Sequence, residues 1–442
     1  MASSEPERSA RNPWWIPPHL LGRVPVAIEP GQLRLLGLIA LALLFENYDF
    51  QLITAALKYI AEDLAIPEAS LGRFMSWIRL GGLPAVLVIP FADWIGRRRL
   101  FLVSMIGLAL GTFATALTQT PLQFVLCQIV SRTFIVTGAA VTYVIVAEEF
   151  PARHRGWGIG MLGAVASAGH ALAAGLFGAI DWLPYGWRAL YALGLAPLFL
   201  LPLFRREVRE TARFERQSKR RFARRGAVDA VRAWSQPLIA FTRTYPRRAL
   251  AITVMGTLAS VSHASVFGFT SFFLLSVHGW RPWHYSLMFI LAGALGIVGN
   301  VVAGRLGDSF GRRLIGFFFL GSFPFFGWAF YAGPQWTVPL AWIPLVFAVM
   351  AGNVTLRALA TEVFPTAQRG TSAGWLFVVE TLGAFIGLQL VDALAHGERF
   401  DPEAVIRVGF VVLLGAFFIV LLPETRSREL ETISPEEDDQ TG

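Results

Sequence analysis

Long apolar runs separated by short charged connections dominate the pattern of this chain. Runs of about 20 apolar residues, the length that an α-helix needs to cross the hydrocarbon of a membrane, fall into two sets. The first set lies near residues 34–57, 69–92, 100–118, 122–146, 157–179 and 188–204. The second set lies near residues 249–276, 285–304, 314–332, 338–360, 371–394 and 405–422. The pattern predicts an all-α membrane protein with twelve transmembrane helices.

Several short segments recur at one spacing, 214 or 215 positions apart. Residues 89–98 (IPFADWIGRR) return as residues 304–313 (GRLGDSFGRR), and residues 148–156 (EEFPARHRG) return as residues 362–370 (EVFPTAQRG). The same spacing relates a Glu-Thr pair and three glycines: Glu210-Thr211 to Glu424-Thr425, and Gly156, Gly160 and Gly169 to Gly370, Gly374 and Gly383. Such a repeat indicates two pseudo-symmetric six-helix bundles, which is typical of secondary transporters.

The repeat and the apolar runs together divide the chain. A cytoplasmic N-terminal segment is expected at 1–33, the N-terminal bundle at 34–204, a basic linker at 205–248, the C-terminal bundle at 249–422 and a cytoplasmic tail at 423–442. With 55% hydrophobic and 15% charged residues, the composition excludes a soluble globule.

The basic residues are distributed unevenly between the two sides of the membrane. With a cytoplasmic N-terminus, 28 of the 38 Lys and Arg residues fall in cytoplasmic segments and six in outer loops. Because basic residues are enriched in cytoplasmic loops, we expect both termini in the cytoplasm and the protein in the inner (plasma) membrane. The first 30 residues lack a short apolar core with a small-residue cleavage site, so no signal peptide is expected.

The net charge of +8 follows mostly from this asymmetry. The basic stretch 205–248 suits anionic lipid head groups, and nucleic acid is not an expected partner. The one cysteine, Cys127, lies inside a predicted span, which excludes an intramolecular disulfide and a cysteine metal site. The chain carries no phosphate-binding glycine loop before a lysine and no His-Glu-x-x-His motif. We therefore expect that the protein is not an enzyme and that it binds no cofactor and no metal.

The recurring segments resemble the major facilitator superfamily, whose loop between helices 2 and 3 carries a pattern near G-x-L-A-D-R-x-G-R-R, echoed between helices 8 and 9. Residues 304–313 are close to this pattern, whereas the first copy has Ile89 in place of glycine and Trp94 in place of a basic residue. Residues 210–214 (ETARF) and 423–431 (PETRSRELE) resemble the sugar-porter and organic-acid branches. The resemblance implies two bundles that rock around a central site.

The resemblance also implies a cytoplasmic gate, a group of charged residues that latches the halves together when the transporter faces outward. A carboxylate at the start of a helix is stabilised by the free N–H groups and the helix dipole, and nearby arginines can pair with it. The alternative is that these residues only set topology and cap helices. The expected gate residues are Asp93, Arg97, Glu148, Arg155, Asp308, Arg312, Glu362 and Arg369.

Ionisable residues inside the spans are few, and such groups usually face a water-filled cavity or one another. Glu46 and Asp49, three residues apart, share one face of the first helix. Counted from the outer helix ends, Asp49, Arg79 and Arg132 lie near one level. We expect Asp49, with Glu46, to exchange a proton while Arg79 or Arg132 competes between that carboxylate and an anionic substrate. A static ion pair is the alternative.

The second half carries fewer charges inside its spans. Glu380 lies near the middle of the eleventh span, and His263 occupies the position that the repeat equates with Asp49. Tyr48, beside Asp49, could stack on a ring or a sugar. The predicted substrate cavity therefore comprises Arg79, Arg132, Glu380, His263 and Tyr48.

These patterns favour a proton-coupled symporter of a small organic acid or related metabolite that works by alternating access. The expected partners are the small-molecule substrate, protons and membrane lipid, and we expect a monomer. The alternatives are a sugar porter, a drug/proton efflux antiporter and a non-transporting membrane sensor. The efflux alternative is less well supported, because antiporters usually carry a glycine-proline signature in helix 5 and residues 156–181 contain no proline.

Overall fold

The structure is a computed structural model that describes residues 13, 24–25, 28–151, 154–210, 242–365 and 368–426. The side chains of residues 90, 93–94, 155–156, 297–301, 303–304 and 369–370 also lie outside the description. Over the described ranges the chain is helical and contains no strand. Most of the predicted linker and the ends of both terminal segments lie outside the described residues.

The first half of the chain forms six consecutive helical spans. In order, these are α2 (Pro30–Asp63), the series α3 (Leu71–Arg79), α4 (Leu83–Val88) and α5 (Ala92–Ile95), then α6 (Arg97–Ala116), α7 (Pro121–Glu149), α8 (Arg155–Phe177), and the series α9 (Trp187–Ala192), α10 (Ala196–Phe199) and α11 (Leu201–Glu207). Prolines begin α2 and α7, where the missing N–H costs no hydrogen bond. The second span is broken because Gly81 and Gly82 precede Pro84.

The second half repeats this order. It comprises α14 (Pro246–Gly268) with α15 (Thr270–Ser276), α16 (Pro282–Phe310), α17 (Arg312–Ala332), α18 (Val338–Glu362), α19 (Arg369–Leu394), and α20 (Pro402–Gly409) with α21 (Val412–Phe417). Among the described residues, ten helical stretches are long and apolar enough to cross a membrane. The broken series from α3 to α5 and helix α16 occupy the other two predicted positions. The structure thus confirms the predicted twelve-span, all-α architecture.

Each half is held together by helix pairs that approach closely at glycines. The most extensive contacts join α2 to α8 in the first half and α14 to α19 in the second. A Cβ atom on Gly169 of α8 would overlap the carbonyl oxygen of Leu44, and one on Gly383 of α19 would overlap that of Thr257. Small residues let helix backbones approach in a membrane, where dispersion contacts replace the hydrophobic effect. The repeated glycines therefore form equivalent crossings in the two halves.

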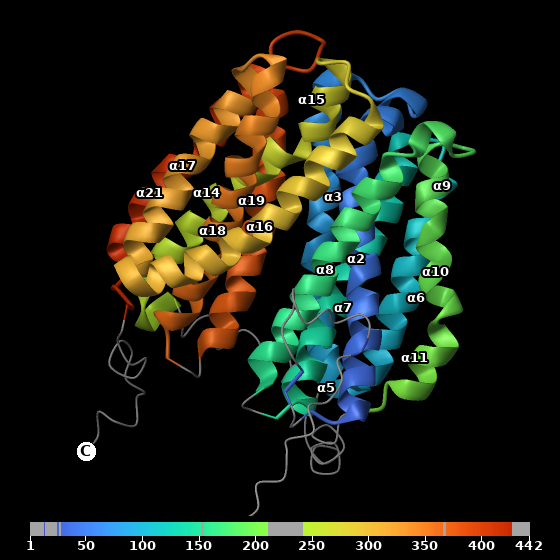
Figure 1. The fold of residues 1–442 in the computed structure, drawn as a ribbon, viewed down its shortest axis with the longest axis vertical. Coiled ribbons are helices and arrows are strands. Elements are labelled where there is room, and N and C mark those ends of the chain that lie inside the picture. Colours follow the sequence, from blue (N-terminus) through green and yellow to red (C-terminus); the bar gives the residue numbers. More distant parts are fainter. Residues whose placement is uncertain are drawn as a thin grey trace, which may run out of the picture.

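The two halves lie side by side and meet at one end of the molecule (Figure 1). We call the end that carries the recurring segments 89–98, 148–156, 304–313 and 362–370 the motif end, and the other the opposite end. Helix α19 packs on α3, α16 on α8, and α15 on α2. The largest core cluster joins opposite-end residues of the first half, such as Leu52 and Phe74, to the second half. Toward the motif end, the first half has a separate core around Leu43 and Phe101.

Candidate functional site

Asp49 lies inside the first half, between α2, α6 and α7. Its side chain is buried, with 2% exposure. The hydroxyl of Thr112 on α6 donates a hydrogen bond of 2.7 Å to its Oδ1, and Arg132 on α7 interacts with it electrostatically. The Nε2 of Gln128, also on α7, donates to Thr115 at 3.2 Å. A carboxylate in an apolar bundle thus has a hydroxyl donor and a guanidinium as its compensating partners.

Glu46 lies one turn before Asp49 and is as deeply buried, at 1% exposure. Among the described residues, neither of its carboxylate oxygens has a hydrogen-bond partner. Its Oε1 occupies the space where a Cβ atom on Gly138 of α7 would lie, so the absence of a side chain there makes room for the carboxylate. Burying an ionised carboxylate without partners costs much free energy, which makes Glu46 an unusual residue for a merely structural position.

Two arginines from different helices converge on Phe50 of α2. The guanidinium carbon of Arg79, at the end of α3, lies 5.0 Å from the ring centroid, and that of Arg132 lies 4.3 Å from it. Both are cation–π contacts. The structure therefore brings together Asp49, Arg79 and Arg132, the three charges that the sequence placed at one level. Arg132 is the shared element, since it contacts Phe50 and faces Asp49.

Tyr48 is buried in the structure, and its place in the substrate cavity stays a prediction. Its hydroxyl donates to the carbonyl oxygen of Leu190 at 2.8 Å, and its ring belongs to the large core cluster that joins the halves. Tyr48 and Asp49 are neighbours on a helix, so their side chains diverge by roughly 100°. His263 packs edge-on against Phe323 of the same half, with 4.5 Å between ring centroids.

Glu380 of α19 pairs with an arginine that the sequence analysis did not assign to the cavity. The guanidinium of Arg357 on α18 donates to Glu380 Oε2 at 3.1 Å. The Arg357 side chain is 61% exposed and that of Glu380 is 18% exposed. The arginine within the tenth predicted span was the signal in the sequence.

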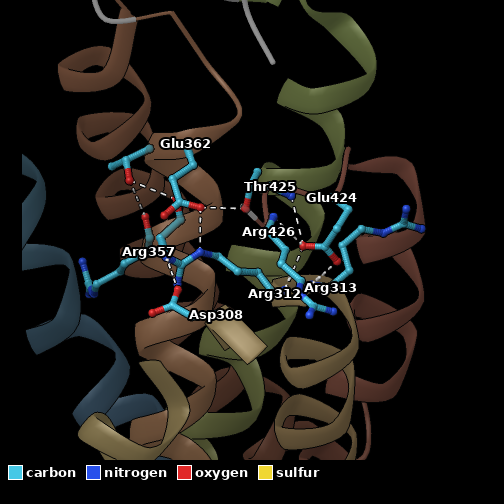
Figure 2. A network of polar contacts seen from close by, with 10 residues as sticks. Asp308, Arg312, Arg313, Arg357, Glu362, Glu424, Thr425 and Arg426 are labelled. Atoms are coloured by element: carbon cyan, nitrogen blue, oxygen red, sulfur yellow. Dashed lines mark hydrogen bonds and ion pairs between the residues drawn. The ribbon is translucent and has the colours of Figure 1, made fainter. Parts of the chain in front are cut away.

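At the motif end of the second half, Arg312 is the centre of a polar cluster (Figure 2). Its Nε pairs with Glu362 at 2.8 Å, and its second terminal nitrogen pairs with Asp308 at 3.1 Å. The hydroxyl of Thr425 donates to the same Glu362 oxygen at 2.7 Å. The cluster thus ties together the end of α16, the start of α17, the end of α18 and the segment after the last span.

Glu424 caps the start of α17. Its carboxylate accepts from the backbone N–H groups of Arg312 and Arg313, at 2.9 and 3.2 Å. The first half repeats this device, because Glu210 accepts from the N–H of Arg97 at 2.9 Å and from that of the following residue at 3.3 Å. Both carboxylates satisfy free N–H groups at a helix N-terminus. Sequence reasoning did not count Glu210 and Glu424 as site residues, although their shared offset of 214 was visible.

Arg97 pairs with Glu148 at 3.1 Å, as Arg312 pairs with Glu362 in the second half. The side chains of the other three predicted gate residues, Asp93, Arg155 and Arg369, lie outside the described part of the structure. Each ion pair found among the described residues joins residues of one half. The latch between the halves at the motif end stays a prediction for another conformation.

The contacts that join the halves instead lie toward the opposite end. Asp392 of α19 accepts from the N–H groups of Gly72 and Arg73 at the start of α3, at 2.8 and 2.6 Å. Gln389 Nε2 donates to the hydroxyl of Ser76 at 2.9 Å. The other hydrogen bonds between the halves among the described residues join Lys58 to Leu275, Ser271 to Ala55, Phe400 to Glu68, Gln51 to Tyr285 and Ser286 to Ala174. The structure is therefore closed at the opposite end.

The fold and the duplicated charged clusters define a class of membrane transporter. The family model of the Major Facilitator Superfamily matches residues 39–388. The chain belongs to this superfamily, whose members are transporters and not enzymes, and it is a multi-pass membrane protein.

Curated relatives extend the similarity over most of the chain. A cis,cis-muconate transport protein of Acinetobacter baylyi is 28% identical over 416 residues, which cover 86% of this chain and 90% of that protein. A gallate transporter of Pseudomonas putida is 30% identical over 194 residues, 42% of each chain. The xylose transporter XylE from E. coli, in an inward open conformation, has a TM-score of 0.70 at 18% identity, covering 91% of this chain and 98% of that one. This last likeness supports the fold alone.

Proposed function

We propose that the protein is a proton-coupled symporter that carries a small organic acid by alternating access. The observation that carries the proposal is the group that the buried Asp49 and Arg132 form with the half-buried Arg79 around Phe50. A carboxylate and two guanidiniums at one depth of a membrane bundle provide both a proton acceptor and a binding surface for an anion. The muconate and gallate transporters named above support an organic acid as the substrate class.

Coupling follows from competition for Arg132. In the state described here, Arg132 compensates the charge of Asp49. An anion that draws the guanidinium away leaves the carboxylate in an apolar setting, which favours its protonated form. Substrate and proton would then be carried together. The anion alone would leave the Asp49 carboxylate without its guanidinium, and the proton alone would leave the Arg132 guanidinium without its carboxylate. Glu46, buried without hydrogen-bond partners one turn away, would serve as a second proton acceptor on the same helix.

We further propose that the motif end is cytoplasmic, which makes the described state inward-facing. The excess of basic residues in the loops of this end supports the orientation, as the positive-inside rule expects. We also propose that the protein acts as a monomer in the plasma membrane. Outward-facing states would require the hydrogen bonds at the opposite end to break and the clusters around Arg97 and Arg312 to contact the other half.

Reconstituted protein tests the proposal directly. Proteoliposomes should accumulate labelled cis,cis-muconate or gallate when the outside is acidic, and an uncoupler should abolish accumulation. Asp49→Asn should lose pH-driven accumulation and retain exchange of substrate across the membrane. Xylose and a cationic drug serve as controls for the sugar-porter and efflux alternatives, and binding without accumulation would indicate a sensor. Undiminished pH-driven uptake by Asp49→Asn would exclude Asp49 as the proton carrier.

A further inference from the structure

Arg357 points away from the membrane surface that lies closest to it. Helix α18 ends at Glu362, so the Cα atom of Arg357 lies about 7.5 Å from the motif end of its helix. Long basic side chains near a helix end usually extend to the nearest water. The guanidinium of Arg357 instead reaches Glu380, which lies 11 residues into α19 from the same end, or about 16 Å. Figure 2 shows the Arg357 side chain extending away from Arg312 and its cluster.

Arg357 also lies near the first half of the molecule, because Tyr143 on α7 is within electrostatic range of both Arg357 and Glu46. Tyr143 is 37% exposed, and the Arg357 side chain is 61% exposed. Because α7 and α18 belong to different halves, this exposed surface lies where the halves face each other toward the motif end. An exposed charge at membrane depth belongs in a water-filled passage, since exposure to lipid would be costly.

Among the described residues, most of the hydrogen-bonding capacity of Arg357 has no partner. One terminal nitrogen donates to Glu380 Oε2, and this is the one side-chain hydrogen bond of the guanidinium within the described part of the chain. The planar group has five N–H donors, which match a carboxylate in a bidentate arrangement. Water screens an ion pair whose arginine side chain is 61% exposed, so a carboxylate in the passage can compete with Glu380 for the guanidinium.

We propose that Arg357 binds the carboxylate of the substrate in the passage at the motif end, and that Glu380 holds the guanidinium in place while the passage is empty. The proposal rests on the proposed function, because it needs an organic anion as the substrate. Under this proposal, the second half of the molecule is responsible for the preference for an acid over a neutral analogue of the same shape. Asp49, Arg79 and Arg132, all in the first half, remain the coupling group.

Binding of an acid and its neutral analogue to the purified full-length protein tests the assignment. The probes are gallic acid and its primary amide, with muconic acid and its diamide as a second pair, and dissociation constants are measured by calorimetry. The unmodified protein should bind the acid about tenfold more tightly than the amide, since charge-assisted bidentate hydrogen bonds are strong. Arg357→Gln should reduce this preference to within about twofold, and Arg357→Lys should retain part of it.

Two further variants separate binding from structure. Glu380→Gln removes the competing carboxylate and should tighten binding of the acid by about threefold, without tightening binding of the amide. Arg407→Gln is the matched control, because Arg407 forms an exposed pair of 2.7 Å with Glu403 in the same half, near the opposite end. It should leave both dissociation constants unchanged.

The outcomes distinguish this inference from the proposed function. If the unmodified protein prefers the acid and Arg357→Gln, or Arg357→Lys where the first variant does not fold, keeps the full preference, the assignment of Arg357 is wrong and the transport proposal stands. If the unmodified protein shows no preference for either acid over its amide, the organic-acid proposal itself fails.

Discussion

At the scale of single residues, the charges buried in the first half differ in how they are compensated. Asp49 has a hydroxyl donor and a guanidinium, whereas Glu46 has no hydrogen-bond partner in the part of the chain that the structure describes. A buried acceptor that loses its donor bears the desolvation cost alone. Substitution of Thr112 is therefore the most direct way to perturb the charge state of Asp49, because its hydroxyl contacts the carboxylate and lies on a different helix from both arginines.

Thr112→Val should destabilise the fold and alter coupling together. Loss of the 2.7 Å hydrogen bond to Asp49 should lower the free energy of unfolding by roughly 1–3 kcal/mol. The same loss should shift the pH dependence of substrate uptake. Thermal unfolding in detergent and uptake across a pH series measure the two effects. Thr133→Val is the control, since Thr133 donates to the backbone oxygens of Gly81 and Ile129. An unchanged pH profile in Thr112→Val would separate Thr112 from coupling.

At the scale of helices, the sequence predicted the spans well and the partners of individual side chains poorly. The twelve spans and the paired clusters around Arg97 and Arg312 follow from apolar run length and from one repeated spacing. The partner of Tyr48, the carbonyl oxygen of Leu190, does not follow from the sequence, because α2 is apolar on most of its faces and a membrane helix need not bury one stripe. The partner of Arg357 was also hidden, since Glu380 lies on a different helix.

Caps that come from distant parts of the chain were harder to predict than local ones. Thr120 caps α7 through the N–H of Gln123, three residues away, as a sequence reader would expect. Glu424 caps α17 from more than 100 residues away, so no local pattern reveals it. The repeat was the one available signal, because Glu210 and Glu424 share the offset of the helices that they cap.

The crossing of α14 and α19 depends on a glycine. A Cβ atom on Gly383 would overlap the carbonyl oxygen of Thr257, which is backbone and cannot rotate away. Gly383→Val should therefore separate the two helices and lower the free energy of unfolding by about 1–3 kcal/mol or more, as overpacking does. Gly374→Ala, on the same helix with no atom within 4 Å, should be neutral or slightly stabilising. Thermal unfolding of both variants in detergent would refute the packing argument if it ranked them equally.

At the scale of the whole molecule, the described state is set by contacts at one end. The largest core cluster is continuous between the halves toward the opposite end, while the first half has a separate core toward the motif end. The ion pairs found near the motif end among the described residues lie within one half, so opening that end breaks none of these pairs. Under the proposed alternating access, the change of state would exchange the hydrogen bonds of one end for those of the other.

Among the contacts at the opposite end, the two hydrogen bonds of Asp392 should contribute most to keeping this end closed. Its carboxylate accepts two backbone N–H groups at the start of α3, where the helix dipole favours a negative charge. The approach is close because Gly72 has no side chain; a Cβ atom there would overlap the carbonyl oxygen of Leu388. Asp392→Ala removes both hydrogen bonds and should shift the population toward the state open at this end by about tenfold.

Distances between spin labels on the two halves would measure this shift. The labels would be attached to cysteines that replace Gln119 and Trp336, which are exposed in the connections at the opposite end, one in each half. Cys127 would first be replaced by alanine, so that it carries no label. Asp392→Ala should add a longer distance to the distribution. Asp63→Ala is the matched control, because Asp63 pairs at 2.7 Å with Arg188 of its own half at the same end. If the distribution is the same in Asp392→Ala as in the parent protein, the carboxylate does not hold the halves together, and the other hydrogen bonds with the shared apolar core keep this end closed.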